Sequence, residues 1–270
     1  MTTVREELAV ASESLAEVGC ETPRLDAEIL LARVLGTDRA GLVMASQDEV
    51  SGDDRTRYLA LMTRRVKREP IAYITGYRDF RRLTLAVDPR VLIPRPESEL
   101  LVEVGLGLPV GVRVADIGTG SGAVALALKD ERPDLQLIGV DVSEGALSVA
   151  RMNGSRLRLE VEWWLGDLLE DVECDAVLAN LPYVEATAML PPEVAVYEPK
   201  VALFSGVDGL DLIRSLAAQA GARPEVALLA LEVGAGQAPT VGELVLTAGF
   251  SELEVLKDLA GIERVVVGRR

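Results

Sequence analysis

The chain has 270 residues, and hydrophobic residues make up 49% of them, which is enough for a sizeable core in one or two domains. Its net charge of −15 is uneven: residues 1–94 contain 14 basic and 15 acidic residues, whereas residues 95–270 contain 14 and 28. The acidic C-terminal part disfavours nucleic acid, and the absence of histidine excludes Ser-His-Asp and Cys-His catalysis and most metal sites, so no metal is expected.

The composition favours a cytoplasmic protein. No run of about 18 uncharged apolar residues suggests a membrane span, and the first residues lack the apolar stretch of a signal peptide. Two cysteines are too few for a disulfide framework, which fits a reducing compartment. We expect a monomer.

The first 70 residues are predicted to form a small helical bundle. Apolar residues recur every three or four positions over 4–18, Thr22-Pro23 begins a second helix that Gly36 ends, and a third helix is expected at about 53–67.

A basic cluster overlaps the third helix and the residues after it. Its members surround only two acids, Glu69 and Asp79. It is either a solvated helix face followed by a linker, or a docking patch for an acidic partner or RNA. The basic residues are Arg55, Arg57, Arg64, Arg65, Lys67, Arg68, Arg78, Arg81 and Arg82.

Residues 71–95 have a different character. The runs 71–77 and 83–87 are rich in β-forming residues around a polar turn, which predicts a β-hairpin linker. Two prolines in Leu92-Ile93-Pro94-Arg95-Pro96-Glu97 exclude a regular helix or strand interior, and composition alone makes Arg95 and Glu97 linker residues with a surface salt bridge. We therefore expect a helical domain at 1–70, a β-hairpin linker at 71–95 and a second domain at 96–270.

From residue 112 onward, short apolar runs alternate with helical stretches. This alternation predicts an α/β fold with a doubly wound, mostly parallel, seven-stranded sheet and right-handed crossovers. Only a short turn separates the last two strands, so the last strand is expected to be antiparallel. Strands are predicted at 112–117, 135–141, 159–163, 175–179, 226–233, 252–256 and 264–267, and helices at about 122–130, 144–153, 208–220 and 238–248.

A glycine-rich turn, Asp116-Ile117-Gly118-Thr119-Gly120-Ser121-Gly122, follows the first of these strands. Glycines let a backbone approach a ligand closely, and the following helix start offers unpaired N–H groups, although a plain tight turn is the alternative. A dinucleotide site has the spacing G-x-G-x-x-G, whereas this turn has G-x-G-x-G. The motif resembles that of class I S-adenosylmethionine-dependent methyltransferases, which implies that Asp116 helps hold the amino-acid end of the cofactor.

Two further acids follow the next two strands. Asp141 ends a strand 19 residues after Gly122, where a carboxylate accepts both ribose hydroxyls in either nucleotide cofactor class. Asp167 follows the third strand. The methyltransferase resemblance implies that Asp167 bonds the adenine amino group and that Leu168 packs on the ring; a helix cap or turn is the alternative for Asp167.

The segment Asn180-Leu181-Pro182-Tyr183 leaves the apolar run 176–179, at the strand end where open α/β sheets bind ligands. It resembles the [DNS]-P-P-[YFW] motif of methyltransferases that act on planar nitrogens, with Leu181 replacing the first proline; a plain strand-exit turn is the alternative.

The chemistry of a planar nitrogen fits these residue types. An amide or aromatic NH2 is a poor nucleophile because its lone pair is delocalised. The side-chain oxygen of Asn180 and the backbone carbonyl of Leu181 can orient both N–H bonds, while Tyr183 stacks on the planar group. Leucine supplies this carbonyl as well as proline does, but it leaves the backbone less rigid.

Four further segments resemble the HemK/PrmC family, the release factor glutamine N5-methyltransferases. They are Glu69-Pro70-Ile71-Ala72-Tyr73-Ile74-Thr75-Gly76, the 92–97 segment, Tyr197-Glu198-Pro199-Lys200-Val201-Ala202-Leu203 and Ile262-Glu263-Arg264-Val265. The resemblance covers nearly the whole chain. It implies methyl transfer from S-adenosyl-L-methionine to the glutamine of the Gly-Gly-Gln loop in bacterial peptide chain release factors. It also implies that the helical domain docks this partner, and that Arg95 and Glu97 line the approach to the cofactor or the substrate loop.

Three other functions stay open. An adenine N6-methyltransferase acting on RNA or DNA would share the 180–183 motif, but the acidic C-terminal part argues against it. The leucine at position 181 leaves room for a partner of the translation machinery that binds the cofactor without catalysis. An NAD-dependent oxidoreductase would need a different glycine spacing.

Overall fold

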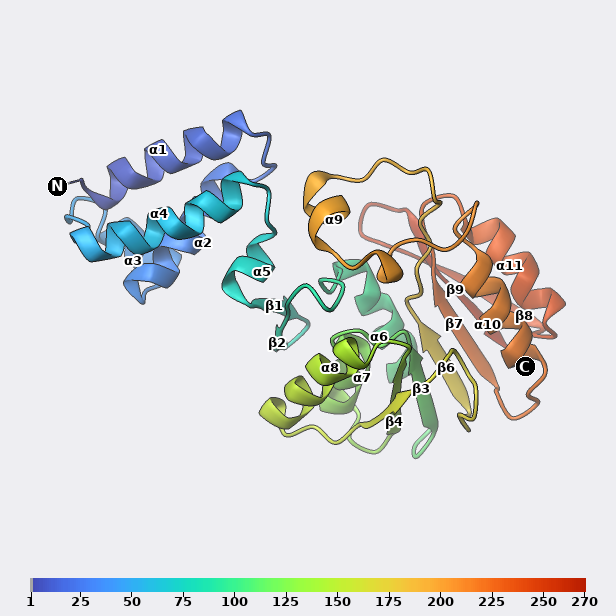
Figure 1. Cartoon of the computed structure of the whole chain (residues 1–270). Helices are drawn as coiled ribbons and strands as arrows, with labels where there is room; N and C mark the ends of the chain where they lie inside the picture. The colour runs from blue at the N-terminus through green and yellow to red at the C-terminus, as the bar shows by residue number, and fades with distance from the viewer. Residues whose placement is uncertain (1) are drawn as a thin grey trace. The chain divides into compact units, whose positions relative to one another are not determined.

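The computed structural model describes residues 2–270, which divide into two compact units. The first unit contains the chain up to Gly76 together with Leu190–Tyr197, and the second contains Tyr77–Met189 and Glu198–Arg270. Figure 1 labels the elements of both units.

The first unit is helical, as predicted. Its first helix begins with a capping box, in which the Thr3 hydroxyl accepts a bond from the Glu6 amide and the Glu6 carboxylate accepts one from the Thr3 amide. Gly36, in the left-handed conformation, ends the second helix. The helices are α1 (Val4–Glu17), α2 (Pro23–Leu35), α3 (Arg39–Met44), α4 (Gly52–Val66), α5 (Ile71–Thr75) and α9 (Pro192–Tyr197).

The arginines of the basic cluster mostly take part in ion pairs. Arg65 pairs with Asp26 at 2.7 Å and with Glu193 of α9 at 3.1 Å, and Arg68 pairs with the same Glu193 at 2.5 Å. Because Arg65 and Asp26 are buried, these pairs join α9 to the N-terminal helices from inside the unit. This part of the cluster is an internal network and not a solvated face.

The prediction of a strand at 71–77 is wrong, because Ile71–Thr75 forms α5. Pro70 starts this short helix, Gly76 ends it in the left-handed conformation, and Ala72, Tyr73 and Ile74 are buried by it. The strands β1 (Tyr77–Phe80) and β2 (Leu83–Ala86) do form the expected antiparallel hairpin.

The hairpin is bonded into the second unit. Asn153, which is fully buried, accepts a bond from the Ala86 amide at 2.8 Å and donates to the carbonyls of Ala86 and Ser121, each at 3.0 Å. One side chain therefore connects the hairpin to the glycine-rich turn.

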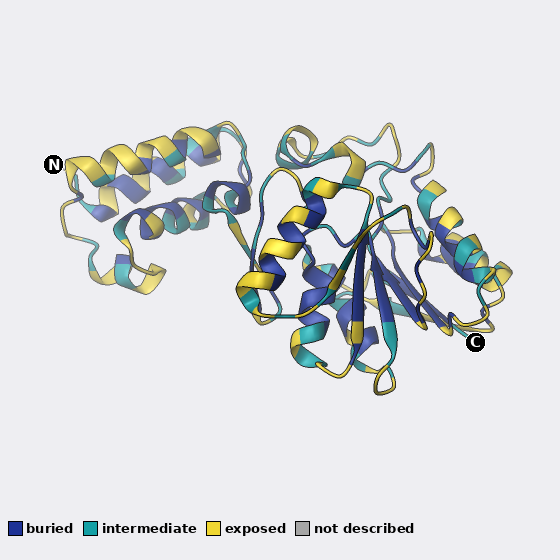
Figure 2. Ribbon diagram, turned by 60° about the horizontal axis from the view of Figure 1, so that its bottom comes forward, coloured by how far each residue is buried: buried dark blue, intermediate teal, exposed yellow. Residues whose placement is uncertain are grey.

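The second unit is built on the predicted seven-stranded sheet, in the order β5-β4-β3-β6-β7-β9-β8. The pairs from β5 to β7 are parallel, and β9 is antiparallel to both of its neighbours, which confirms the antiparallel last strand. Figure 2 shows the central strands as the buried middle of this unit. The strands are β3 (Arg113–Ile117), β4 (Gln136–Asp141), β5 (Glu162–Leu165), β6 (Ala176–Ala179), β7 (Leu228–Glu232), β8 (Glu252–Lys257) and β9 (Glu263–Arg269).

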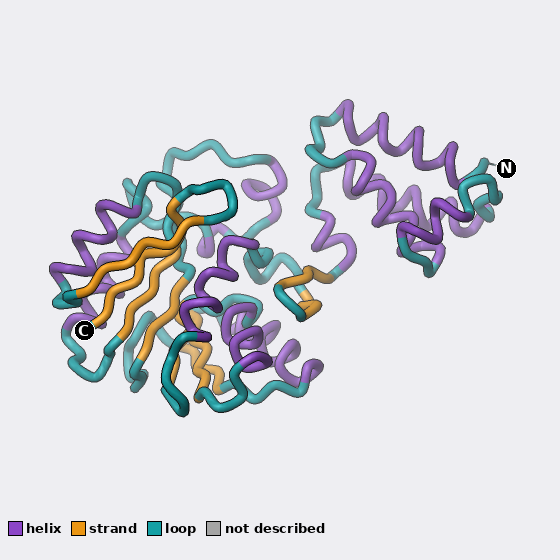
Figure 3. The backbone as a smooth tube through the Cα atoms, turned by 180° about the vertical axis from the view of Figure 1, so that it is seen from behind, coloured by secondary structure: helices purple, strands orange, loops and turns teal. Residues whose placement is uncertain are grey.

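Helices cover both faces of the sheet, and Figure 3 shows them from behind. One apolar core lies beneath α6 and α7, and the other lies beneath α10 and α11. The helices of this unit are α6 (Glu99–Leu106), α7 (Ala123–Glu131), α8 (Glu144–Leu157), α10 (Asp211–Gly221) and α11 (Ala238–Thr247), with the 3-10 turns η1 (Pro96–Ser98) and η2 (Lys200–Ala202).

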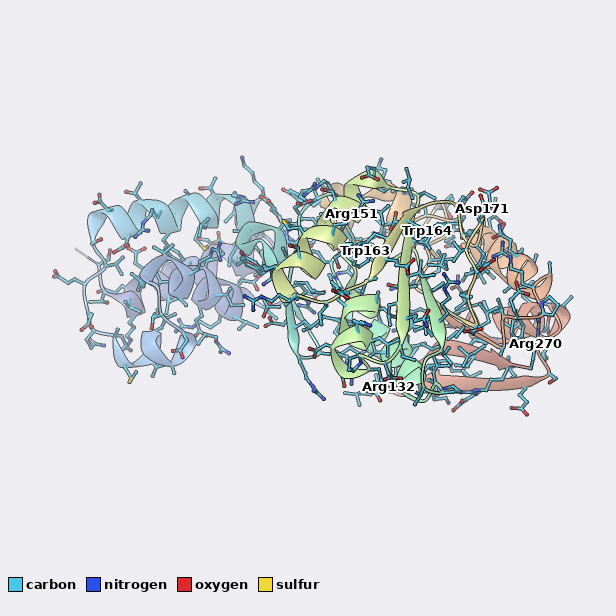
Figure 4. The ribbon with its side chains drawn as sticks, turned by 90° about the horizontal axis from the view of Figure 1, so that it is seen from below. Arg132, Arg151, Trp163, Trp164, Asp171 and Arg270 are labelled. Atoms are coloured by element: carbon cyan, nitrogen blue, oxygen red, sulfur yellow. The ribbon has the colours of Figure 1, made fainter. Side chains whose placement is uncertain are left out.

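The strand predicted at 159–163 begins three residues later, at Glu162. Helix α8 is longer than expected, ending at Leu157 with Arg158 as its left-handed cap, so the apolar residues just after it pack on the core before β5 begins. Trp163, labelled in Figure 4, lies against Gly122, Gly139 and Gly154, where its ring fills the space that side chains would otherwise take.

Among residues 2–270, no helix is long and apolar enough to cross a membrane. The same residues include no group of three or more acidic or cysteine side chains placed to hold a metal ion.

Candidate active site

A cavity of about 220 Å³ opens at the carboxyl ends of β3, β4 and β6, inside the second unit. Most of the predicted site residues line it, although they come from segments far apart in the chain. Those residues are Arg95, Asp116, Gly118, Thr119, Gly120, Ser121, Asp141, Asp167, Leu168, Asn180, Leu181 and Pro182. Gly122, Glu97 and Tyr183 are not part of the cavity wall.

The amides of the glycine-rich turn bond mainly within the protein. The Gly118 and Thr119 amides both donate to the Val140 carbonyl, at 2.9 and 3.0 Å, and the Gly120 amide donates to the Asp141 carboxylate at 2.9 Å. A pyrophosphate binds such a turn through amides that point at the ligand. In this turn the amides of Gly118, Thr119 and Gly120 are already bonded within the protein, which argues against binding of a pyrophosphate and so against a dinucleotide cofactor.

Asp116 and Asp141 are held in defined positions beside the cavity. The Asp116 carboxylate, which is buried, accepts bonds from the Thr119 hydroxyl at 2.6 Å and the Ala125 amide at 3.2 Å. Burial raises the pKa of Asp116 to about 6 and also raises the pKa of Asp141. Asp167 is exposed at the rim and Leu168 is buried beside it. Three carboxyl groups around one cavity suit a ligand that carries positive charge.

The 180–183 segment begins directly after β6. The Asn180 amide nitrogen donates to the Ser98 hydroxyl at 2.8 Å, which leaves the side-chain oxygen as the free end of the amide. Leu181 is buried at 5% exposure and is part of the core, so its side chain faces the protein interior. The Tyr183 ring packs against the same core, and its hydroxyl donates to Glu232 at 3.3 Å.

The expected surface salt bridge between Arg95 and Glu97 is replaced by a different pair. Arg95 donates to Glu198 at 2.6 Å, and the Glu198 side chain is only 1% exposed. Burial raises the pKa of Glu198, and the nearby Arg95 guanidinium opposes that rise. Arg95 lines the cavity, as does Pro199, the residue after Glu198, whereas Glu198 itself is not part of the cavity wall.

Sequence analysis missed Ser98, Glu198 and Glu232. Ser98 donates to Glu232 at 2.6 Å, and both residues are buried. Glu232 ends the apolar strand β7 just as Asp141 ends β4, so an acid at the end of an apolar run was the signal that could have identified it. Ser98 follows the proline-rich 92–97 segment and had no comparable signal.

We expect the free energy of unfolding of the ligand-free protein to fall as the pH rises from about 5 to about 8. Burial raises the pKa of Glu232 from 4.5 to about 7, so the folded state binds a proton that the unfolded chain releases. This proton stabilises the folded protein fully at a pH below the pKa that Glu232 has in the unfolded chain. The stabilisation is lost as the pH rises through the pKa that Glu232 has in the folded protein.

Replacing Glu232 with glutamine removes this titration. Glu232→Gln should be more stable than the parent at pH 8 by as much as roughly 3 kcal/mol, with little difference at pH 5. Denaturant unfolding of both proteins at the two pH values measures this. Equal pH dependence in the two proteins would contradict the assignment.

Comparison with known proteins accounts for both units. The sequence model of the PrmC N-terminal domain matches residues 6–76, and that of the methyltransferase small domain matches residues 96–194. A release factor glutamine methyltransferase from Geobacter sulfurreducens is 39% identical over 99% of this chain and 96% of its own. One from Burkholderia pseudomallei is 40% identical over 100% of this chain and 99% of its own. A solved methyltransferase from Pyrococcus furiosus shares the fold, with a TM-score of 0.51 and 18% identity over 68% of this chain and 87% of its own.

Proposed function

This chain belongs to the release factor glutamine methyltransferase family, and we propose that it transfers a methyl group from S-adenosyl-L-methionine to a glutamine side chain of bacterial peptide chain release factors. The target is the amide nitrogen, N5, of the glutamine in the Gly-Gly-Gln loop. The observation that carries this proposal is the position of Asn180, which lines an acidic cavity and whose amide nitrogen, not its oxygen, is bonded to Ser98.

The cavity suits this cofactor. S-adenosyl-L-methionine would supply a methyl group activated by a sulfonium, and it carries an ammonium group as well. Asp141 is proposed to accept from the ribose hydroxyls, and Asp116 and Asp167 are proposed to face the amino-acid end and the adenine amino group. The two arginines in the wall, Arg90 and Arg95, are paired with Asp88 and Glu198, so the cavity keeps its acidic character.

The residues of the 180–183 segment would prepare the nitrogen. The Asn180 oxygen and the Leu181 carbonyl would accept hydrogen bonds from the two N–H groups of this nitrogen. These bonds would orient its lone pair toward the methyl carbon and disfavour delocalisation of that pair into the amide. As the new N–C bond forms and the C–S bond breaks, the nitrogen loses one of its protons to solvent. Tyr183, held by Glu232, would fix the plane of the amide.

Adenine N6 methylation is the weaker candidate. It needs the same two acceptors, but the curated relatives that cover this whole chain are named for release factor glutamine. The excess of acid in residues 95–270 also opposes a polyanionic substrate.

Mass spectrometry of a release factor after incubation with this protein and S-adenosyl-L-methionine tests the proposal. The expected product carries one added methyl group on the Gly-Gly-Gln glutamine. An unmodified release factor, or methylation of an RNA or DNA oligonucleotide in a parallel reaction, would overturn it.

We also propose that the first unit docks the release factor at a distance from the glutamine loop. Support comes from the match of residues 6–76 to a domain that accompanies this enzyme family. In the same assay, the whole release factor should then be methylated with a higher kcat/KM than a short peptide that contains Gly-Gly-Gln. Equal values for the two substrates would remove the docking role.

A further inference from the structure

A buried polar chain runs from the end of β7 to the end of β6. The Ser98 hydroxyl donates to one carboxylate oxygen of Glu232 at 2.6 Å, and the Asn180 amide nitrogen donates to that hydroxyl at 2.8 Å. Tyr183 donates to the other oxygen of Glu232 at 3.3 Å. Glu232 is 1% exposed and Ser98 is 4% exposed, so water does not compete for these groups.

The hydrogen bonds from Asn180 to Ser98 and from Ser98 to Glu232 can point in only one direction. An ionised carboxylate only accepts, so it draws the single hydroxyl proton of Ser98 toward itself. The lone pairs of Ser98 then face Asn180 and accept only from its NH2 end. The amide oxygen of Asn180 is therefore turned away from Ser98, and Asn180 is one of the residues that line the cavity.

We propose that Glu232, acting through Ser98, is a positioning residue that fixes which end of the Asn180 amide faces the substrate nitrogen. This inference rests on the proposed function, because it assigns Asn180 the role of accepting an N–H bond from the substrate. Without Ser98, the Asn180 amide could turn by half a rotation and present its NH2 group, which would repel the substrate amide instead of orienting it.

Burial of a carboxylate is costly, and the hydrogen bonds from Ser98 and Tyr183 offset part of that cost for Glu232. The charged groups that face Glu232 are Glu97 and Arg264, whose effects on it are opposed, and the Tyr183 phenol anchors its second oxygen. Burial is the largest influence and brings the pKa of Glu232 to about 7. Once protonated, Glu232 could itself donate to Ser98, and the fixed direction of the chain would be lost.

The experiment compares the parent with Ser98→Ala, Glu232→Gln and the double variant in release factor methylation and in direct binding of S-adenosyl-L-methionine. Ser98→Ala should lower kcat by roughly 10- to 100-fold, as a misaligned reacting group does, while the Kd of the cofactor stays within about twofold. A glutamine at position 232 can either accept a hydrogen bond from Ser98 or donate one to it, depending on the orientation of its amide. Ser98 therefore keeps a partner but not a fixed direction, and Glu232→Gln should lower kcat by a smaller factor than Ser98→Ala does. It should also flatten the rise of kcat with pH that the parent shows around pH 7.

Two controls separate this role from a structural one. Ser205→Ala removes another buried serine of the same unit, one that accepts a bond from the Leu212 amide and does not itself line the cavity, and it should leave kcat unchanged. Since Glu232 acts through Ser98, the double variant should match Ser98→Ala within about a factor of two.

Parental kcat in Ser98→Ala would overturn the inference, as would independent, multiplying effects of the two substitutions or a parental pH profile in Glu232→Gln. A parent protein that methylates no release factor would instead refute the proposed function, so the two failures are distinguishable.

Discussion

Replacing Asn180 by alanine should abolish methyl transfer to release factor and leave cofactor binding largely intact. The side chain provides one of the two acceptors that orient the substrate amide, and removal of a single preorganised polar group from an active site costs roughly 10²–10³-fold in kcat. Cofactor affinity should change little because the carboxylates that would contact the cofactor are provided by other strand ends.

Single-turnover methylation and calorimetric titration with S-adenosyl-L-methionine measure the two properties separately. Gln219→Ala is a matched control, since it also deletes a side-chain amide, one that accepts a bond from the Leu169 amide away from the cavity. Methylation at a near-parental rate by Asn180→Ala would refute the assigned role. Loss of cofactor binding in that variant would mean that Asn180 belongs to the cofactor site instead.

Replacing Asp141 by alanine should produce the opposite pattern, with weak cofactor binding and a kcat that recovers at saturating cofactor. The carboxylate is held by the amides of Gly120 and Ser143, each at 2.9 Å, so it is aimed before any ligand arrives. Hydrogen bonds to a charged group contribute about 1.5–3 kcal/mol each. Loss of two such bonds to the ribose predicts a Kd at least roughly 10²-fold higher.

Asp134→Ala is the control for Asp141→Ala. This aspartate forms an ion pair with Arg132 at 2.7 Å away from the cavity wall, so its removal should leave the Kd unchanged. If both variants bind S-adenosyl-L-methionine as the parent does, Asp141 has no part in ribose recognition. If both variants bind S-adenosyl-L-methionine weakly, the loss of affinity comes from the loss of a negative charge in general and not from the loss of a contact between Asp141 and the ribose.

Sequence alone predicted the parts of this molecule that local pattern determines. Asp116 is the penultimate residue of a buried strand, Asp141 ends one and Asn180 follows one, and parallel strands bring such ends to one edge of a sheet. The mostly parallel sheet and its antiparallel last strand followed from the alternation of short apolar runs with helical stretches, whereas the order of the strands did not. The family resemblance, which the relatives confirm over the whole chain, added the target that local pattern did not provide.

What sequence did not reveal depends on contacts between distant residues. Ser98 and Glu232 are 134 positions apart, and only the folded sheet makes them neighbours. The β-forming composition of 71–75 favoured a strand, but a proline start and a glycine stop made a one-turn helix whose apolar residues the first unit buries. The arginine cluster was interpreted as a solvated face or a docking patch because Glu193, which pairs with Arg65 and Arg68, is more than a hundred residues away in the sequence.

The leucine at position 181 has a consequence for how this sequence can change over time. A side-chain carbon placed on Gly118 would lie 3.1 Å from the Leu181 side chain, so the glycine-rich turn and the 180–183 segment restrict each other. Leu181→Pro would match the common form of the motif, yet it would also leave unfilled the space that the buried leucine occupies beside Gly118. Such dependence between two positions is epistasis, and a proline that other methyltransferases accept at this point of the motif is expected to destabilise this one.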